Sequence, residues 1–148
     1  MKTAKLIGIA THQRSKGEIT LHKEAIITLP QGLNDHQGRK NTRTAVTLLS
    51  LAQWQQACQE AGCDLQWWHR RAQLLINDDT FSAEDIGKRF QIGTAILEVT
   101  KETDPCARMD QLCQGLKAAL TPDFRGGVRC QVIQAGVIHL NDQLIRLD

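Results

Sequence analysis

The sequence predicts a mainly β fold with two helices, in which about eight short strands form a barrel-like sheet. Short apolar runs bounded by Gly, Pro, Asn or Asp recur along the chain, whereas only two stretches carry apolar residues at helical spacing. No Gly-x-Gly-x-x-Gly motif or phosphate-binding loop indicates a parallel βαβ array. The 148 residues, 41% apolar and 23% charged, suit one globular domain, which we expect to span residues 1–148.

The first two strands are predicted at Lys5–Ala10 and Glu24–Leu29, which are rich in Ile and Leu and bounded by polar, Gly or Pro residues. We expect these two strands to pair with each other. Residues 31–43 follow, with two glycines, two asparagines and a single apolar residue. This composition favours turns, so we expect a loop that is long enough to carry function.

A strand over Thr44–Leu49 and a helix over residues 51–61 are expected next. Ser50 stands at the N-cap position of that helix, and a glycine follows its last residue. Gln73–Ile76 and Arg89–Thr100 contain further strand-like runs. The second run is interrupted by a glycine, which indicates a tight hairpin or a bulge.

The second helix is predicted over residues 106–120, because Asp104 and Pro105 form a typical helix start. Asp caps the free N–H groups, Pro is tolerated in the first turn, and apolar residues then recur on one face. From Val128 to Leu147 the pattern returns to short apolar runs separated by turn residues. The chain is therefore expected to end in an antiparallel or mixed sheet.

The charge balance and the apolar runs exclude two classes of partner. Lys plus Arg number 18 and Asp plus Glu number 16, and the net charge of +2 predicts no nucleic-acid binding by a basic surface alone. The longest early apolar run, Leu6–Ala10, is far shorter than a signal-peptide core or a bilayer span. We therefore expect a cytoplasmic protein with no membrane partner.

The five cysteines have irregular spacings and no CxxC pair, so we expect neither a disulfide framework nor a zinc ribbon. Cys58, Cys63, Cys113 and Cys130 are expected to pack as small apolar residues. Cys106 differs because it lies in the first turn of a predicted helix, where free N–H groups and the helix dipole favour a thiolate. Cys106 is therefore either a functional thiolate, as metal ligand or nucleophile, or another packed thiol.

Arg125, Gly126 and Gly127 connect the second predicted helix to the last strands. Paired glycines permit backbone conformations or close approaches that a Cβ would block, and the forked guanidinium suits a phosphate or a carboxylate. The alternative interpretation is a surface turn with a solvated arginine.

Two further groups of cations have the same two interpretations. Arg39, Lys40 and Arg43 lie in the expected loop, where they either bind an anion or are solvated. Arg70 and Arg71 follow two tryptophans and a histidine, where they either contact an anion or cover an apolar edge with their stems.

Seven segments occur in an order that is typical of one family. Four come from the C-terminal half: Ile92–Thr100 (IGTAILEVT), Pro105–Cys106, Arg125–Gly127 (RGG) and Gly136–Asp142. Three weaker matches come from the N-terminal half: Leu6–Ala10 (LIGIA), Gln31–Gly38 (QGLNDHQG) and His69–Ile76 (HRRAQLLI). Together they resemble the MOSC domain, named for the C-terminal domain of molybdenum-cofactor sulfurases, in its small stand-alone bacterial form.

The resemblance implies a β-rich MOSC-like barrel and a molybdenum cofactor (molybdopterin) as ligand. Members of known activity reduce N-hydroxylated substrates, and the cysteine that matches Cys106 ligates molybdenum or carries sulfur. Thiolate is a soft ligand that suits both roles. The alternative to an enzyme is a sulfur carrier or cofactor-delivery module that uses a Cys106 persulfide, and a third possibility is a scaffold. The family also has an association with pyridoxal phosphate binding.

The resemblance also assigns supporting roles. The implied cofactor-binding residues are Arg125, Gly126 and Gly127, which shape the pocket, and Arg71 and Asp35, which support it. Arg39, Lys40 and Arg43 are expected to add positive charge, because three cations lie in one short loop. A reductase would need electrons from a redox partner, because the chain has no flavin, haem or iron–sulfur motif, and a sulfur carrier would need a sulfur-donor protein.

The sequence departs from the family pattern at two positions. Asn34 precedes Asp35 where the family usually has Gly, in a loop one residue shorter, and Gln73 stands where Asn is usual. Both positions bear on the ligand site more than on the fold.

Overall fold

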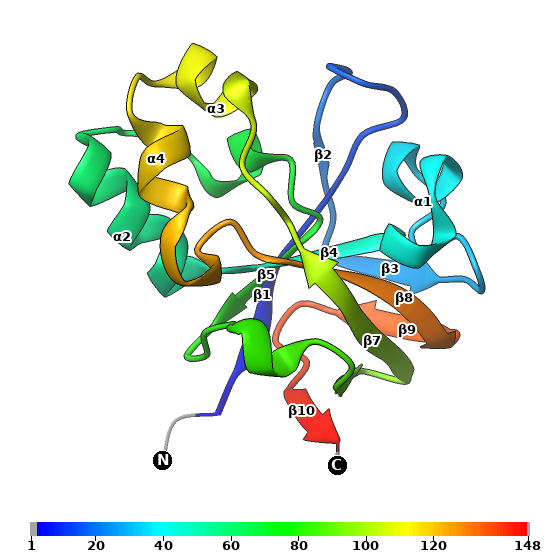
Figure 1. Ribbon diagram of the computed structural model, residues 1–148. Coiled ribbons are helices and arrows are strands. Elements are labelled where there is room, and N and C mark those ends of the chain that lie inside the picture. Colours follow the sequence, from blue (N-terminus) through cyan, green and yellow to red (C-terminus); the bar gives the residue numbers. More distant parts are fainter. Residues whose placement is uncertain (1–2, 148) are drawn as a thin grey trace.

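The computed structural model describes residues 3–147, and its strands form two sheets (Figure 1). The strands are β1 (Lys5–Thr11), β2 (Thr20–Leu21), β3 (Glu24–Ile27), β4 (Val46–Ser50), β5 (Leu74–Asn77), β6 (Arg89–Ile92), β7 (Ala95–Glu102), β8 (Val128–Gln134), β9 (Gly136–His139) and β10 (Leu144–Leu147). Eight of them form one sheet in the order β10-β6-β7-β8-β4-β5-β1-β2, and β3 pairs with β9 in the other. The mainly β fold class is therefore confirmed.

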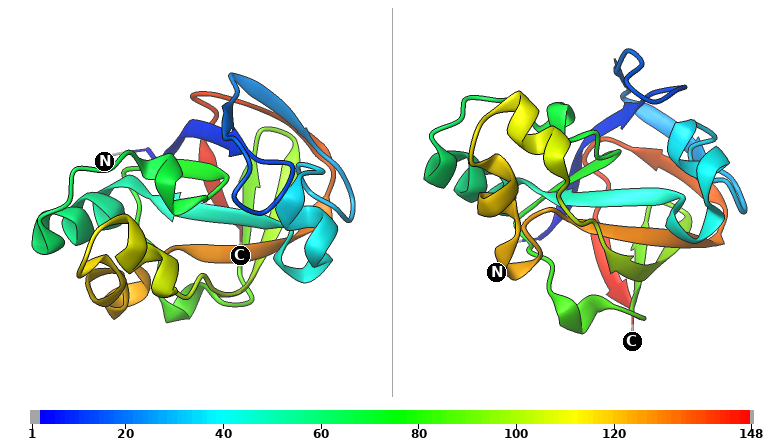
Figure 2. Two further views of the ribbon diagram at one scale, coloured as in Figure 1. Left: turned by 90° about the horizontal axis from the view of Figure 1, so that it is seen from above. Right: turned by 45° about the horizontal axis from the view of Figure 1, so that its top comes forward.

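The helices are shorter and more numerous than predicted. They are α1 (His36–Lys40), α2 (Leu51–Ala61), α3 (Ala107–Leu112) and α4 (Leu116–Leu120), with 3₁₀ turns η1 (Thr42–Thr44), η2 (Trp67–Arg70), η3 (Ala83–Asp85) and η4 (Pro122–Phe124). Four α-helices within residues 3–147 replace the two expected, and none is long and apolar enough to cross a membrane. In both ribbon figures α2, α3 and α4 gather together and α1 lies apart from them (Figures 1 and 2).

The predicted helix over residues 51–61 is confirmed. The Ser50 side chain accepts a hydrogen bond from the backbone N–H of Gln53 at 3.3 Å, which is the N-cap arrangement. Gly62 ends the helix in the left-handed region, with φ of 71°.

The predicted helix over residues 106–120 is instead divided into α3 and α4. Gly115 has φ of 92°, a value that a continuing helix does not allow. Asp110 then caps the new helix, because its Oδ1 accepts the backbone N–H groups of Gly115 at 3.2 Å and Lys117 at 3.0 Å. The expected loop over residues 31–43 contains α1, which begins where the Asp35 side chain caps the N–H of Gln37.

The expected barrel is not closed within the described strands, because the strand order has two ends. Near the closing point Leu6 exchanges backbone hydrogen bonds with the turn before β10, donating to Asp142 at 2.8 Å and accepting from Asn141 at 2.7 Å. The strands β1 and β10 themselves are linked only through an isolated bridge between Lys5 and Gln143. Asn141 has φ of 77°, so the chain turns here and does not extend a ladder.

The expected pairing of the first two predicted strands is wrong. β1 pairs with β2 and β5, whereas β3 pairs with β9. In the β3–β9 ladder Ala25 lies opposite Ile138, which is buried, and Ile27 is buried as well. Both strands therefore contribute their apolar faces to the core from a second sheet.

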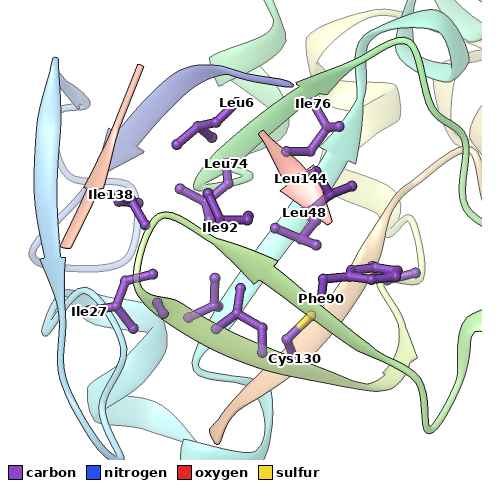
Figure 3. Close-up of a cluster of buried hydrophobic side chains, with 14 of the residues drawn as sticks. Leu6, Ile27, Leu48, Leu74, Ile76, Phe90, Ile92, Cys130, Ile138 and Leu144 are labelled. Carbon is purple, nitrogen blue, oxygen red and sulfur yellow. The ribbon is translucent and has the colours of Figure 1, made fainter. Parts of the chain in front are cut away.

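The main core lies between the strands, and Figure 3 shows its side chains pointing toward one another. The labelled members are Leu6, Ile27, Leu48, Leu74, Ile76, Phe90, Ile92, Cys130, Ile138 and Leu144. A second cluster lies under the helices, where Trp54 and Ala57 of α2 meet Met109 of α3 and Leu116 and Leu120 of α4. The helices are therefore fixed to the sheet by apolar packing of their own.

The structure contains a disulfide bond, which corrects the expectation that all five cysteines are free. Cys63 follows α2 and is bonded to Cys113, the residue that ends α3. The sequence pattern could not indicate this bond, because the two cysteines are 50 residues apart and come together only through the packing of α2 against α3 and α4. Cys58 and Cys130 are free and buried, as expected.

Candidate functional site

Cys106 is an exposed free thiol at the point where the chain leaves β7 and enters α3. It occupies the N-cap position of α3 with extended backbone angles, and its side chain makes no capping hydrogen bond. The other free thiols, Cys58 and Cys130, are buried, and burial raises the pKa of both. Cys106 is thus the free thiol of residues 3–147 that solvent and ligands reach.

Arg70, the last residue of η2, is 7% exposed. Its Nη2 donates to the Thr103 carbonyl oxygen at 2.8 Å, and its Nη1 lies 4.0 Å from the Met109 sulfur. Burial lowers the pKa of Arg70 to about 10, and the nearby Cys106 is the first of the groups that oppose this shift. The guanidinium and the thiol are therefore within electrostatic range of each other.

Gly126 makes room for this buried arginine. A Cβ at Gly126 would lie 2.5 Å from the Thr103 carbonyl oxygen and 3.0 Å from Arg70 Nη2, so any side chain would displace the hydrogen bond between them. Gly127 has φ of 97°, which only glycine adopts readily. The paired glycines thus allow the connection to β8 to pass directly against Arg70.

Five buried side-chain atoms within residues 3–147 form no hydrogen bond in the structure. They are the Nε atoms of Arg70, Arg108, Arg125 and Arg129 and the hydroxyl of Thr103. Arg108 lies in α3 next to Cys106, and Arg129 lies in β8 and lowers the pKa of Arg70. Because buried donors in proteins almost always have acceptors, the Nε atoms of Arg70, Arg108 and Arg129 are free to donate to a ligand or to water. We call Cys106, Arg70, Arg108 and Arg129 the thiol–arginine site.

Asp35 is fully buried and serves the structure of the loop that contains α1. Its carboxylate accepts hydrogen bonds from the backbone N–H groups of His12 at 3.3 Å and Gln37 at 3.2 Å, and from Gln73 Nε2 at 2.7 Å. Gln73 Oε1 in turn accepts the backbone N–H of Thr47 at 2.8 Å. Gln73, which stands where Asn is usual, therefore connects the loop to β4.

Arg71 lies at the end of η2 with φ of 64°, in the left-handed region that side-chain-bearing residues seldom adopt. Its Nη1 donates to the carbonyl oxygen of Gly17 at 2.8 Å. Burial lowers the pKa of Arg71, and the positive charge of Arg108 lowers it further. Arg71 is therefore brought close to the thiol–arginine site.

The Arg125 guanidinium is bonded to residues of α2 and α4. Its Nη1 forms an ion pair with Glu60 of α2 at 2.9 Å and donates to the Ala119 carbonyl oxygen of α4 at 3.0 Å. Arg125 is 8% exposed, so this ion pair is largely shielded from water on the arginine side. The guanidinium therefore connects two helices, and no contact between it and Cys106 is formed.

The three cations of the expected anion-binding loop are exposed. Arg39 and Lys40 end α1, and Arg43 lies in η1, where its carbonyl oxygen accepts the hydroxyl of Thr100 at 2.8 Å. α1 lies apart from α3 in all three views (Figures 1 and 2). The structure thus does not bring these cations to Cys106.

Sequence reasoning did not single out Arg129, and of the two consecutive arginines it assigned Arg71 and not Arg70 to the ligand. A signal for Arg70 was present, since the pair is predicted either to contact an anion or to cover an apolar edge. Nothing in the local sequence marks Arg129, which is brought near Arg70 by the pairing of β8 with β4 and of β4 with β5.

No group of three or more His, Cys, Asp or Glu side chains within residues 3–147 is placed to hold a metal ion. A metal at Cys106 would therefore need to bring most of its own ligands. A metal that enters already bound to a sulfur-containing cofactor meets this condition. The thiol and the unpaired donors around it thus fit a molybdenum–pterin group better than a bare ion.

The sequence model of the MOSC domain family matches residues 33–145. No curated protein matches the chain. Among solved structures, the YuaD protein from Bacillus subtilis superposes with a TM-score of 0.81 at 14% identity, over 97% of this chain and 94% of that one. The YiiM protein from Geobacillus stearothermophilus superposes with a TM-score of 0.71 at 15% identity, over 98% of this chain and 75% of that one. The YiiM protein from Escherichia coli superposes with a TM-score of 0.71 at 14% identity, over 97% of this chain and 70% of that one. At these identities the likeness shows a shared fold.

Proposed function

Because this chain belongs to the MOSC domain family, we propose that it binds a molybdenum cofactor with Cys106 as the metal ligand and acts as a reductase of N-hydroxylated substrates. One observation carries the proposal: an exposed free thiol lies within electrostatic range of the buried guanidinium of Arg70, whose Nε has no acceptor among residues 3–147. Such an arrangement is costly without a ligand, since a buried unpaired donor loses roughly 1 to 3 kcal/mol.

Each member of the thiol–arginine site has a distinct task. Cys106 loses its proton to become a ligand, and Arg70 stabilises the resulting negative charge from below. Arg108 and Arg129 donate to anionic or heteroatom acceptors of the cofactor. Gly126 keeps Arg70 bonded to Thr103 and so aimed at the thiol.

When bound, the cofactor would supply two-electron redox chemistry at the metal. The protein residues would orient the substrate, exclude water on the side of Arg70, and provide the fixed positive charge that balances the anionic ligand. Electrons would come from a separate redox protein, because the sequence carries no other redox cofactor motif.

A second candidate function uses the same thiol. Cys106 is exposed and makes no capping hydrogen bond, so it is open to the active site of a sulfur-donor protein. As a persulfide it would carry sulfur and not a metal. The two functions differ in what the purified protein holds on Cys106.

The deciding measurement is the molybdenum and pterin content of protein purified from a host that makes the cofactor. We expect near-stoichiometric content in the wild type and none in Cys106→Ser. A persulfide mass increment on Cys106 without molybdenum would instead support the sulfur carrier. Neither molybdenum nor persulfide would overturn both functions.

Two buried arginines give a matched comparison. Arg70→Met should lower cofactor content tenfold or more, since about 1.4 kcal/mol of lost interaction is a factor of ten. Arg125→Met should have a smaller effect, because that guanidinium is engaged by Glu60 and Ala119. Equal losses in both variants, with both folded, would show that Arg125 holds the ligand as the sequence resemblance implies.

A further inference from the structure

Three cations from three elements meet at the end of β7 that leads to Cys106. Lys101 of β7 is the Cα partner of Arg129 in β8. The Thr100 hydroxyl joins the third element to this pair, because it lies 2.8 Å from the Arg43 carbonyl oxygen in η1 and 3.2 Å from the Arg129 carbonyl oxygen. We call Arg43, Lys101 and Arg129 the cationic cluster.

A β-bulge in β7 brings Lys101 to the same face as Arg129. The Cα partner of Val99 is Cys130, and both side chains are buried. Lys101 follows Val99 by two positions, but its partner precedes Cys130 by only one, so one residue of β7 is left over. Without the extra residue Lys101 would point toward the core, because side chains alternate between the two faces of a strand. The bulge therefore places two positive charges directly opposite each other on the outer face.

No ion pair within residues 3–147 neutralises the cationic cluster. The ion pairs that the structure forms there involve Arg125, His139 and Arg146 as the positive partners. Like charges directly opposite each other in a ladder are destabilising, so nothing in the fold favours the pairing of Lys101 with Arg129. The cluster is thus positive charge that is available to a partner outside the chain.

The surroundings of the cluster favour an acidic protein over other polyanions. Glu98 and Glu102 belong to the same strand as Lys101, so the surface is mixed in charge, and the whole chain carries a net charge of only +2. Nucleic-acid binding instead relies on many phosphate contacts along a basic surface. A membrane contact needs apolar anchors, and none of the exposed large apolar side chains of residues 3–147 belongs to β7, β8 or η1.

We propose that the cationic cluster docks a carboxylate-rich face of the electron-donor protein that the proposed function requires. The inference rests on the proposed function for the identity of that protein. Lys101 precedes Cys106 by five positions, which is at most about 18 Å of extended chain. A standard interface covers roughly 800 Å² per partner, which corresponds to a patch about 30 Å across. A partner docked on the cluster therefore also reaches the thiol.

The test uses a synthetic decaglutamate peptide that ends in a thiopyridyl disulfide. In the reaction with the full chain, the Cys106 thiolate attacks the peptide sulfur and releases thiopyridone, whose absorbance gives the rate, and mass mapping confirms the modified cysteine. Docking of the carboxylates raises the effective concentration of the disulfide at Cys106. At low ionic strength we expect a rate roughly tenfold above that of a Gly–Ser peptide of the same length with the same disulfide. At about 1 M salt, where the Debye length is about 3 Å, the two rates should be equal.

A double substitution removes the cluster without touching the thiol–arginine site. Arg43→Gln/Lys101→Gln should react with the acidic peptide about as slowly as with the neutral one, and its rate with the neutral peptide should equal that of the wild type. Lys5→Gln removes an exposed cation at the start of β1 and should retain the full acceleration. No acceleration in the wild type, or full acceleration in Arg43→Gln/Lys101→Gln, would overturn the docking surface.

Competition decides the class of partner. Free decaglutamate should suppress the acceleration more strongly than oligothymidylate or phosphatidylglycerol vesicles at equal concentration of negative charge. Stronger suppression by either competitor would overturn the choice of a protein. The result is also separable from the proposed function, because Arg43→Gln/Lys101→Gln should retain the molybdenum content of the wild type. Acceleration in a protein that never holds molybdenum would leave the docking surface standing while the cofactor proposal fails.

Discussion

At the residue scale, accessibility separates Cys106 from the other free thiols. Cys58 and Cys130 are buried with raised pKa values, and Cys130 lies within the main core. Because the thiolate is the reactive form, both residues should react slowly in the native fold. Cys106 is exposed, and the positive charge of Arg70 lies nearby.

We therefore expect Cys106 to be the thiol that is alkylated first in the native protein. Competitive alkylation under non-reducing conditions, followed by mass mapping, measures the order in which the free cysteines are modified. Earlier modification of Cys58 or Cys130 in the folded protein would contradict this prediction.

A single Cβ at Gly126 should disturb the site as well as the fold. Gly126→Ala places that atom against the Thr103 carbonyl oxygen, a backbone atom that cannot move freely, and against Arg70 Nη2. Overpacking of this kind costs roughly 1 to 3 kcal/mol. We expect a lower free energy of unfolding in denaturant titration and a lower cofactor content.

Gly62→Ala is the control for this substitution. Gly62 has a positive φ, of 71°, and nothing lies within 4 Å of its added Cβ. It should lose about 1 kcal/mol from backbone strain and retain the cofactor. Equal cofactor loss in both variants would show that lowered stability, and not displacement of Arg70, is the cause.

At the element scale, α3 is the short segment that connects the thiol to the rest of the molecule. It begins after Cys106 and ends at Cys113, whose disulfide joins it to Cys63 at the end of α2. Met109 packs in the cluster under the helices. A helix of six residues has little stability of its own, so these contacts are what hold Cys106 in place.

Loss of the disulfide should therefore destabilise the protein. The bond closes a segment of 50 residues. Because a cross-link lowers the entropy of the unfolded chain, a loop of that length corresponds to roughly 4 kcal/mol of stabilisation. We expect the Cys63→Ser/Cys113→Ser variant to unfold at lower denaturant concentration than the wild type. Wild-type protein with reductant should match the variant, and an unfolding midpoint that reductant leaves unchanged would contradict the prediction.

The loop that contains α1 shows how an element absorbs a change in sequence. Gln73 stands where the resembling family has Asn, and its longer side chain spans from Asp35 to the backbone of Thr47. Asn34 takes φ of 55°, which suits a residue type that tolerates the left-handed region where the family usually has Gly. The two departures therefore alter how the loop is anchored, and they leave the thiol–arginine site in place.

At the scale of the whole molecule, the site is assembled by strand pairing. β1 runs antiparallel to β5, so His12, just after β1, comes next to the residues that precede β5, as the hydrogen bond from Ala10 N to the Gln73 carbonyl oxygen at 2.7 Å shows. β7 runs antiparallel to β8, which places the approach to Cys106 beside the start of β8. One end of these strands thus collects residues from four separate parts of the chain.

The β-rich class, most strands and the helix over residues 51–61 follow from the sequence alone, which also marks Cys106 as the cysteine at a helix start and leaves its exposure open. Each depends on neighbouring residues: alternation of short apolar runs with turn residues, a serine cap, a terminating glycine, and a Pro–Cys pair. The resemblance to the MOSC domain added the family, which the match over residues 33–145 then showed.

The open strand order, the pairing of β3 with β9, the division of the second helix and the disulfide depend on tertiary contacts. The same contacts bring Arg70 within electrostatic range of Cys106 and hold Arg125 against Glu60. The reason is physical. Local patterns record propensity and capping, which act over a few residues, whereas burial, strand register and the electrostatic effect of one buried charge on another depend on residues that meet only after the chain has folded.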